Sequence, residues 1–258
     1  MIELRNISAG YRNKIVLNNI SVTFPKGKLI CVIGENGSGK STLLKTATGI
    51  LPSKAGEIII DGQKSTEMSR QSIAQKISYL AQFNRSFDMT VHQLVLHGRF
   101  AHLHYPRIYS SEDRAIAASC MERMGVSHLA STPMHELSGG MQQNAYIAMA
   151  LAGCSDYILL DEPTTYLDVA NKFQLMNTLQ ELSSEGKGVV AVLHDLTLAM
   201  QFADEIVVIS NGQLLAKQSP ENIINSNIIN RTFGISIGRN KTENGYVYYL
   251  DSTKNKHL

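Results

Sequence analysis

Long apolar runs are absent from this 258-residue sequence, and none approaches the roughly 18 residues that a helix needs to cross a bilayer. The first residues, Met-Ile-Glu-Leu-Arg-Asn, lack the apolar core of a signal peptide. A strong excess of one charge is also missing, because 24 basic residues face 22 acidic ones and no block of like charge stands out. Nucleic acid is therefore not an expected partner. If the protein serves a membrane process, it must dock on another chain that spans the membrane.

Cysteine is scarce, with three residues at Cys31, Cys120 and Cys154. Their number is odd, their spacing is wide and their neighbours are apolar or small, so a disulfide framework is not indicated. No pair of them has the spacing of zinc ligands. These features predict reduced thiols in a cytosolic protein.

Short strands alternate with helices along much of the chain. Residues 29–33 and 157–160 are continuous apolar runs, as expected of strands that are buried on both faces. With helical patterns such as 169–182 between strands, the alternation predicts a mostly parallel sheet covered by helices. Residues 90–153 differ, because helical spacing dominates and no strand pattern interrupts it; we interpret them as a helical insertion. The C-terminal tail shows one possible strand, at 246–250.

A glycine-rich loop, Gly34-Glu35-Asn36-Gly37-Ser38-Gly39-Lys40-Ser41, follows the first buried strand and opens a helix. It matches the P-loop pattern in the required context. Glycines let backbone N–H groups close around phosphate oxygens, and the helix N-terminus adds partial positive charge. Lys40 can bridge the β- and γ-phosphates of a nucleotide, and the Ser41 hydroxyl can coordinate Mg²⁺. The alternative is an ordinary glycine-rich turn between a strand and a helix.

Asp161 and Glu162 stand at the end of the second buried strand. In open α/β sheets, ligands bind at the carboxyl ends of the strands. Asp161 is therefore expected to hold Mg²⁺ directly or through water, and Glu162 to act as general base on an attacking water. A solvated loop is the alternative for an Asp-Glu pair taken alone, and the P-loop upstream favours the metal site.

A second anion cradle occurs at Leu137-Ser138-Gly139-Gly140, which begins a predicted helix. One hydroxyl, several free N–H groups and the helix dipole suit a phosphate. One chain does not need two phosphate cradles for one nucleotide, so we interpret this one as serving the ATP of a partner molecule. The alternative is an ordinary serine N-cap.

Residues 34–42, 137–140 and 160–164 together resemble the Walker A, signature and Walker B motifs of the ABC transporter ATPase family. The resemblance runs from Tyr11 to about Gly212, and the motifs occur in the family's order. It implies an α/β fold with a P-loop NTPase (RecA-like) core, an N-terminal antiparallel β-subdomain and an inserted α-helical subdomain. As a single ABC ATPase domain over 1–258, the chain would consist of a nucleotide-binding core (1–86 and 155–218), a helical signature-motif subdomain (87–154) and a C-terminal tail (219–258).

The resemblance also implies roles for residues outside these motifs. Tyr11 resembles the aromatic residue that stacks on adenine, and His194 resembles the switch histidine that contacts the γ-phosphate. Gln82 resembles the glutamine that reports metal and γ-phosphate to the permease contact. Thr165-Tyr166-Leu167-Asp168 resembles the loop that crosses the dimer interface. Considered singly, Tyr11 could pack on the sheet edge, Gln82 could be a surface amide and His194 could merely end a strand.

The expected site, with ATP and Mg²⁺ as cofactors, therefore has three overlapping sets of residues. The catalytic set is Lys40, Gln82, Glu162 and His194. The ATP-binding set is Tyr11, Gly34, Asn36, Gly37, Ser38, Gly39, Lys40, Ser41 and Thr42, with Ser138, Gly139, Gly140 and Asp168 added for ATP held between two copies. The Mg²⁺ set is Ser41, Gln82 and Asp161.

The signature departs from the family's usual continuation. Where Gln-Arg-Gln-Arg usually follows the glycines, this chain has Met141-Gln142-Gln143-Asn144, in which only Gln143 matches. Two positive charges are therefore missing near the start of that helix. Because Ser138 and the glycine N–H groups remain, we expect the contact to a partner's phosphate to persist, while turnover and nucleotide-driven dimerisation could differ.

The resemblance implies a pair of these chains beneath a multi-span membrane permease, peripheral on the cytoplasmic face and served indirectly by a substrate-binding protein. Residues 161–168, 148–152 and 194–196 resemble importers of ferric siderophores, haem and cobalamin, and the siderophore branch most closely. The cargo never touches this subunit, so this link is one of association. An export ATPase of the same fold, or a non-transport ABC ATPase acting on DNA, ribosomes or iron–sulfur assembly, stays open.

Overall fold

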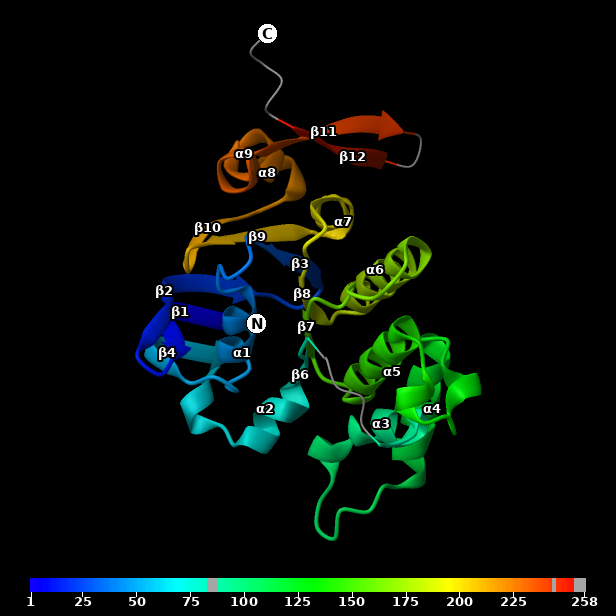
Figure 1. The fold of residues 1–258 in the computed structure, drawn as a ribbon. Coiled ribbons are helices and arrows are strands. Elements are labelled where there is room, and N and C mark those ends of the chain that lie inside the picture. Colours follow the sequence, from blue (N-terminus) through cyan, green and yellow to red (C-terminus); the bar gives the residue numbers. More distant parts are fainter. Residues whose placement is uncertain (83–87, 243–244, 253–258) are drawn as a thin grey trace.

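An N-terminal antiparallel sheet packs against one face of a larger, mainly parallel sheet (Figure 1). The computed structural model describes residues 1–82, 88–242 and 245–252. The antiparallel sheet has the order β2 (Lys14–Phe24), β1 (Ile2–Tyr11), β4 (Ser53–Ile60) and β5 (Gln63–Lys64). The larger sheet has the order β10 (Gln213–Gln218), β9 (Glu205–Ser210), β3 (Lys28–Ile33), β8 (Gly188–Val192), β7 (Tyr157–Asp161) and β6 (Ile77–Leu80).

Helices cover the larger sheet and extend to one side of it (Figure 1). They are α1 (Lys40–Ala47), α2 (Arg70–Lys76), α3 (Val91–His97), α4 (Ser111–Arg123), α5 (Gly139–Ala152), α6 (Val169–Ser184), α7 (Leu196–Phe202), α8 (Pro220–Asn225) and α9 (Ile228–Phe233). Short 3₁₀ turns occur at Ser65–Glu67, Phe100–His102, Ser127–Leu129 and Met134–Glu136. In the part of the chain that is described, no helix combines the length and the apolar character needed to cross a membrane.

Strand β3 shows why its sequence is apolar without alternation. Cys31 and Ile33 face a core shared with helices α5, α6 and α7, whereas Ile30 and Val32 face a core shared with β1, β2 and α1. All four side chains are fully buried. A strand covered on both faces needs apolar residues at every position, which confirms the expectation of a buried parallel sheet.

The segment from Thr90 to Gly153 carries only helices and short turns, apart from an isolated bridge between Thr90 and Pro133. Its helix starts follow local side-chain chemistry. Ser110 caps α4, because its hydroxyl accepts a hydrogen bond from the Asp113 N–H at 3.1 Å while the Asp113 carboxylate accepts one from the Ser110 N–H. The expected subdomain boundary between 86 and 87 lies outside the described residues.

The C-terminal part is packed on the core. The strand expected at 246–250 lies within β12 (Gly245–Ser252), which pairs in an antiparallel hairpin with β11 (Ile235–Thr242). Strand β12 contacts helix α7, and Ile223, Ile229 and Ile237 belong to the same buried cluster as α7. Sequence periodicity did not predict α8, α9 or β11, since two six-residue helices carry little periodic signal.

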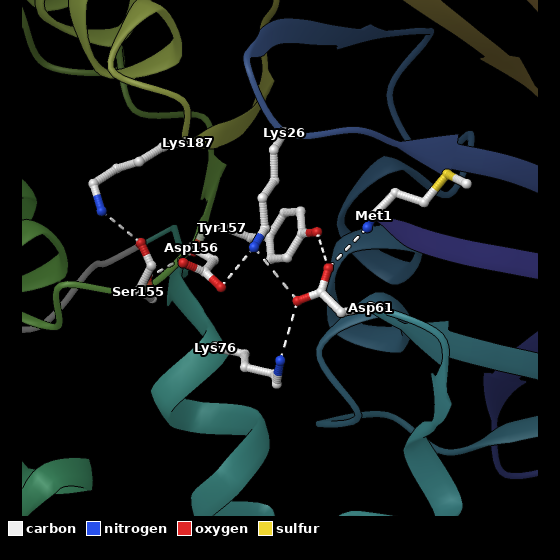
Figure 2. Close-up of polar contacts among 8 residues, drawn as sticks. All are labelled: Met1, Lys26, Asp61, Lys76, Ser155, Asp156, Tyr157 and Lys187. Atoms are coloured by element: carbon white, nitrogen blue, oxygen red, sulfur yellow. Dashed lines mark hydrogen bonds and ion pairs between the residues drawn. The ribbon is translucent and has the colours of Figure 1, made fainter.

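Asp61, at the turn after β4, joins three parts of the chain (Figure 2). Its carboxylate accepts hydrogen bonds from the Met1 amine at 2.8 Å, the Tyr157 hydroxyl at 2.5 Å and the Lys76 ammonium at 3.1 Å, and the Lys26 ammonium lies 3.6 Å away. Burial opposes ionisation of Asp61, but these donors outweigh it and hold its pKa well below the usual range. The Asp61 carboxylate thereby connects the start of strand β1, the end of helix α2 and the start of strand β7.

Replacing Asp61 by Asn tests this network. Asp61 has a φ of 49°, which Asn tolerates, so the substitution removes the charge without adding backbone strain. We expect the free energy of unfolding at pH 7 to fall by about 1–3 kcal/mol, because the cations lose their shared partner. Because the folded pKa is depressed, the Asp61 contribution is present above about pH 4 and is lost as the pH falls, so the difference between the proteins should shrink in acid.

Denaturant unfolding of both proteins between pH 3 and 7 measures this difference. Asp156→Asn is the matched control, because the Asp156 side chain is 50% exposed and its partner Lys26 is 40% exposed. Such an exposed pair contributes less than about 1 kcal/mol. Equal losses for Asp61→Asn and Asp156→Asn, or a difference that grows in acid, would contradict the assignment.

Candidate nucleotide-binding site

The register of the parallel sheet brings the two predicted motifs to one edge. Val32 of β3 and Asp161 of β7 both lie opposite Val192 of β8. With about 4.8 Å between neighbouring strands, their Cα atoms are about 10 Å apart. The loop after β3 and the carboxylates at the end of β7 therefore share the carboxyl edge of the sheet, as expected for ligand binding in this architecture.

In the loop after β3, the side chain of Lys40 is hydrogen-bonded to the loop's own backbone. Lys40 folds back so that its ammonium donates hydrogen bonds to the carbonyls of Gly34 at 2.8 Å and Glu35 at 2.9 Å. Burial lowers the pKa of Lys40, while the nearby Glu162 and Asp161 oppose that shift. The loop depends on glycine at its end: Gly39 has a φ of 108°, and a Cβ there would lie 2.7 Å from a Leu17 methyl group.

Ser38 holds an unusual position in this loop. Its side-chain oxygen is buried and has no hydrogen-bond partner among the residues that the structure describes. Both backbone polar groups of Ser38 are hydrogen-bonded: its N–H donates to the Glu35 carbonyl, and its C=O accepts from the Gly212 N–H at 3.0 Å. A buried hydroxyl without a partner costs free energy. A phosphate oxygen in the loop would supply the missing acceptor, so the orphaned group fits an anion.

Ser41 and Asp161 are in direct contact. The Ser41 hydroxyl donates to one carboxylate oxygen of Asp161 at 2.9 Å, and the Tyr79 hydroxyl donates to the other at 3.3 Å. Burial raises the pKa of Asp161 and Glu162 adds to that, although both hydroxyl donors oppose it. A hydroxyl and a carboxylate are the oxygen ligands that Mg²⁺ prefers, and a cation would favour the buried charged carboxylate. The pair therefore fits a Mg²⁺ site.

Three side chains converge on Glu162. His194 Nε2 lies 2.5 Å from one carboxylate oxygen of Glu162, and the Gln82 side-chain amide donates to the other at 2.8 Å. The Thr165 hydroxyl lies 3.5 Å from that second oxygen. Gln82, expected among the metal ligands, thus contacts Glu162 and not the Ser41–Asp161 pair. Glu162 itself has a φ of 55°, a strained conformation that is typical of functional sites.

A cavity of about 280 Å³ connects these groups to the end of β1. Tyr11 stands at its rim with 45% of its surface exposed, so its ring is available to a planar base. The lining residues are Tyr11, Val16, Asn36, Gly37, Gly39, Lys40, Ser41, Thr42 and Glu162. The arrangement offers an aromatic face, a phosphate loop and a carboxylate in one hollow.

Sequence reasoning missed two residues of this site. Val16 lines the cavity beside Tyr11, and Tyr79 donates to Asp161. Tyr79 lies in β6, which pairs with β7. The sequence shows only that a tyrosine, with its polar hydroxyl, stands near the end of a short strand. Which strand neighbours β7 is not written in local periodicity, so the contact could not be derived.

The second predicted cradle lies in a separate hollow of about 510 Å³. Ser138 caps α5 by accepting a hydrogen bond from the Met141 N–H, and Asp168 caps α6 by accepting one from the Asn171 N–H at 2.8 Å. The hollow is lined by Gly125, Val126, His128, Leu129, Ser138, Gly139, Gly140, Met141, Asn144, Tyr166, Asp168 and Asn171. It shares no lining residue with the cavity at Lys40, so the two predicted cradles lie apart within one chain.

Residues 17–165 match the family model described as ABC transporter. This chain belongs to the ABC transporter family. The ABC protein is 36% identical over 231 residues to the ferric enterobactin transport ATP-binding protein FepC of Escherichia coli (strain K12), covering 89% of this chain and 85% of that one. It is 35% identical to the achromobactin transport ATP-binding protein CbrD of Dickeya dadantii (strain 3937), covering 91% of this chain and 88% of that one.

Solved structures agree with this membership. A dimeric ATP-binding cassette in a post-hydrolysis state, bound to ADP and Pi, superposes with a TM-score of 0.76 at 28% identity over 85% of this chain and 99% of that chain. An inward-facing ABC transporter assigned to the metal-chelate type superposes with a TM-score of 0.84 at 26% identity over 100% of this chain and 99% of that chain. The predicted α/β P-loop fold, the family and the ATP-hydrolysing activity are thereby confirmed.

Replacing Ser38 by Ala tests whether its hydroxyl is kept for a ligand. The free energy of unfolding of the nucleotide-free ABC protein should stay unchanged or rise by up to about 1 kcal/mol, because an unpartnered polar group is removed. The dissociation constant for ATP should increase about two- to tenfold. Ser183→Ala is the control: Ser183 is equally buried, but its hydroxyl donates to the Gln180 carbonyl at 2.9 Å.

The control variant should lose about 1 kcal/mol of stability and keep its affinity for ATP. Denaturant unfolding and equilibrium titration with a fluorescent ATP analogue measure the two quantities. If Ser38→Ala destabilised the nucleotide-free protein as much as Ser183→Ala and bound ATP normally, the Ser38 hydroxyl would have a structural role only.

Proposed function

We propose that this chain is the ATP-hydrolysing subunit of an ABC importer that takes up an iron chelate. A ferric siderophore is the first candidate for the cargo, and haem or cobalamin is the next. The observation that carries this proposal is the similarity over about nine-tenths of the chain to ATP-binding proteins named for achromobactin, petrobactin and ferric enterobactin transport. Similarity to an ABC transporter assigned to the metal-chelate type over the whole chain supports it further. No observation favours an exporter or a non-transport ATPase.

In the proposed site the adenine of ATP stacks on Tyr11 and the triphosphate lies in the P-loop. Backbone N–H groups of residues 34–42 surround the phosphates, and Ser38 gains its missing partner. Lys40 exchanges its carbonyl contacts for the β- and γ-phosphates, which is favourable because its ammonium then meets full negative charges. Mg²⁺, when bound, would be held by Ser41 and Asp161 with Gln82 nearby, and would neutralise phosphate charge.

Glu162 is the proposed general base for hydrolysis. Its carboxylate accepts a proton from the water that attacks the γ-phosphate, which makes the water a better nucleophile. His194 and Gln82 contact its two oxygens and restrict the direction of that carboxylate. Both side chains leave these contacts when they turn toward the γ-phosphate, so the presence of this phosphate is coupled to the orientation of the base.

Each ATP is proposed to lie between two copies of the chain. Ser138, Gly139, Gly140 and Asp168 of one copy would close over the nucleotide held by the P-loop of the other, in an isologous twofold dimer. This arrangement explains why one chain carries two separate anion cradles. Hydrolysis would remove the γ-phosphate that bridges the copies and release them.

The proposed assembly places this pair on the cytoplasmic face of the membrane, bound to a multi-span permease that receives cargo from a substrate-binding protein. Within one chain we assign nucleotide binding to residues 1–86 and 155–218. The helical residues 87–154 would carry the signature cradle, and Gln82 lies shortly before them in the sequence. The buried isoleucines of the tail, 219–258, belong to the same core cluster as α7, and the tail has no proposed role in turnover.

The variant Glu162→Gln tests the base and the dimer together. ATP should still bind, hydrolysis should fall at least about 100-fold, and the protein should elute as a dimer with ATP, because the bridging γ-phosphate persists. Adding Ser138→Glu places a carboxylate beside the partner's triphosphate, so that each copy binds ATP but the dimer disappears. Ser219→Glu is the matched control, since the Ser219 side chain also caps a helix by accepting a hydrogen bond from the N–H three residues on, but at the start of α8.

Size-exclusion chromatography with ATP and a phosphate-release assay give both results. A Glu162→Gln protein that hydrolyses ATP at the normal rate as a monomer would overturn the proposed mechanism. A dimer that resists Ser138→Glu would instead show that the copies associate through another surface.

Uptake assays test the cargo. Cells that lack this chain should lose accumulation of iron from labelled ferric siderophores, and the normal gene should restore it while Glu162→Gln should not. Tagged protein from native membranes should carry a multi-span permease with it. If the ATPase is active in vitro but siderophore, haem and cobalamin uptake are all normal without it, the importer proposal is wrong and the hydrolysis mechanism stands.

A further inference from the structure

The connection between α3 and α4 presents two large apolar side chains to solvent. Tyr105 is 97% exposed and Ile108 is 73% exposed. In Figure 1 this green loop projects from the molecule at the end opposite the C-terminus. These are the two most exposed large apolar side chains among the described residues, and such groups clustered on one projecting loop indicate a contact site for another surface. We refer to residues 104–108 as the tip.

Hydrogen bonds and burial fix the base of this loop, whereas the side chains of the tip are exposed to solvent. Arg99 is buried, donates to the Asp113 carboxylate at 2.9 Å and donates to the Ala152 carbonyl at 3.0 Å. His102 lies 2.8 Å from the Gly153 carbonyl, and Leu103 is buried. The anchored base prevents the loop from folding back to hide its apolar residues, so the tip is presented outward.

The charge of the loop has one sign. Between Gly98 and Ser111 the sequence contains arginine and histidine but no aspartate or glutamate. The Arg107 guanidinium lies 4.8 Å from the centre of the Phe100 ring, and it has no ion pair within the described residues. Arg107 and the exposed His104 flank Tyr105, so the tip combines an aromatic ring, an aliphatic side chain and available cationic character.

We infer that the tip contacts the headgroup region of an anionic lipid bilayer directly. Tyr105, Ile108 and Arg107 match the chemistry of a membrane interface. There, aromatic rings and aliphatic groups enter the boundary between headgroups and acyl chains, the tyrosine hydroxyl stays in contact with water, and cations contact lipid phosphates. The loop that carries the tip projects from the molecule (Figure 1), so a protein partner would have to offer a matching acidic pocket, whereas a bilayer accepts any such protrusion. We therefore favour lipid over a protein partner.

This contact goes beyond the proposed function, because it requires neither ATP hydrolysis nor a permease. One arginine near an anionic surface contributes about fivefold to binding, and partial burial of the tyrosine and isoleucine contributes about tenfold. A single tip therefore gives weak, reversible binding, and two tips in a dimer act together. Its effect would be to orient the ABC protein and to raise its concentration at the membrane.

Flotation of the purified full-length protein with lipid vesicles tests the inference. Vesicles of equal parts phosphatidylglycerol and phosphatidylcholine should capture the wild type at low salt, and pure phosphatidylcholine vesicles should capture several-fold less. Tyr105→Ser with Ile108→Ser should reduce binding about tenfold, and Arg107→Glu about fivefold or more. High salt should weaken the wild type and have little further effect on Arg107→Glu.

Matched controls are exposed residues elsewhere: Leu215→Ser on β10, where Leu215 is 45% exposed, and Lys241→Glu on the C-terminal hairpin. Both should bind vesicles as the wild type does. ATPase activity in vesicle-free buffer and the melting temperature should be unchanged for all tip variants, which separates this result from a failure of folding or of the proposed catalytic function.

Equal binding to both vesicle types, or equal losses for tip and control variants, would overturn the inference. So would vesicle capture that needs a reconstituted permease and is weakened by the tip substitutions, because the tip would then be a protein contact.

Discussion

The parallel pairing of β3 and β7 on either side of β8 is the constraint on which the nucleotide site depends. It brings the P-loop and Asp161, which are more than a hundred residues apart in the chain, to a single hydrogen bond between Ser41 and Asp161. The pairing is stable because the central strands are apolar at nearly every position and are buried on both faces. The rigid sheet edge then holds loops that need no regular structure of their own.

Three groups at this edge depart from the usual state of buried residues. Ser38 has a buried hydroxyl without a partner, Asp161 is a buried carboxylate whose pKa is raised, and Glu162 has a left-handed backbone. Asp61 shows the opposite arrangement, with several donors on one carboxylate and a depressed pKa. The contrast indicates that buried charge is fully satisfied where it serves the fold and is left partly open where a ligand completes it.

The helical segment carries two features that lie apart from the nucleotide site of its own chain. Ser138 and the glycines of α5 lie in a hollow separate from Lys40, and the loop tip at Tyr105 and Ile108 has no cover in the described chain. In the proposed assembly, both features belong to a surface that faces other molecules. There the core sheet would supply the hydrolytic site, and the helical segment would supply contacts to the partner chain and to the membrane.

The sequence by itself determined several features that depend on neighbouring residues: the P-loop, the Asp161–Glu162 pair, the helix start at Ser138, and the buried strand runs. These follow from backbone and side-chain chemistry within a few residues, and the structure shows the elements at these places. Tertiary structure alone decided which distant groups meet, including Tyr79 with Asp161, His194 with Glu162, and Tyr157 with Asp61. The packing of the C-terminal hairpin on α7 belongs here too. Strand order and the direction of each side chain set such contacts, and neither quantity is encoded in the local period of a sequence.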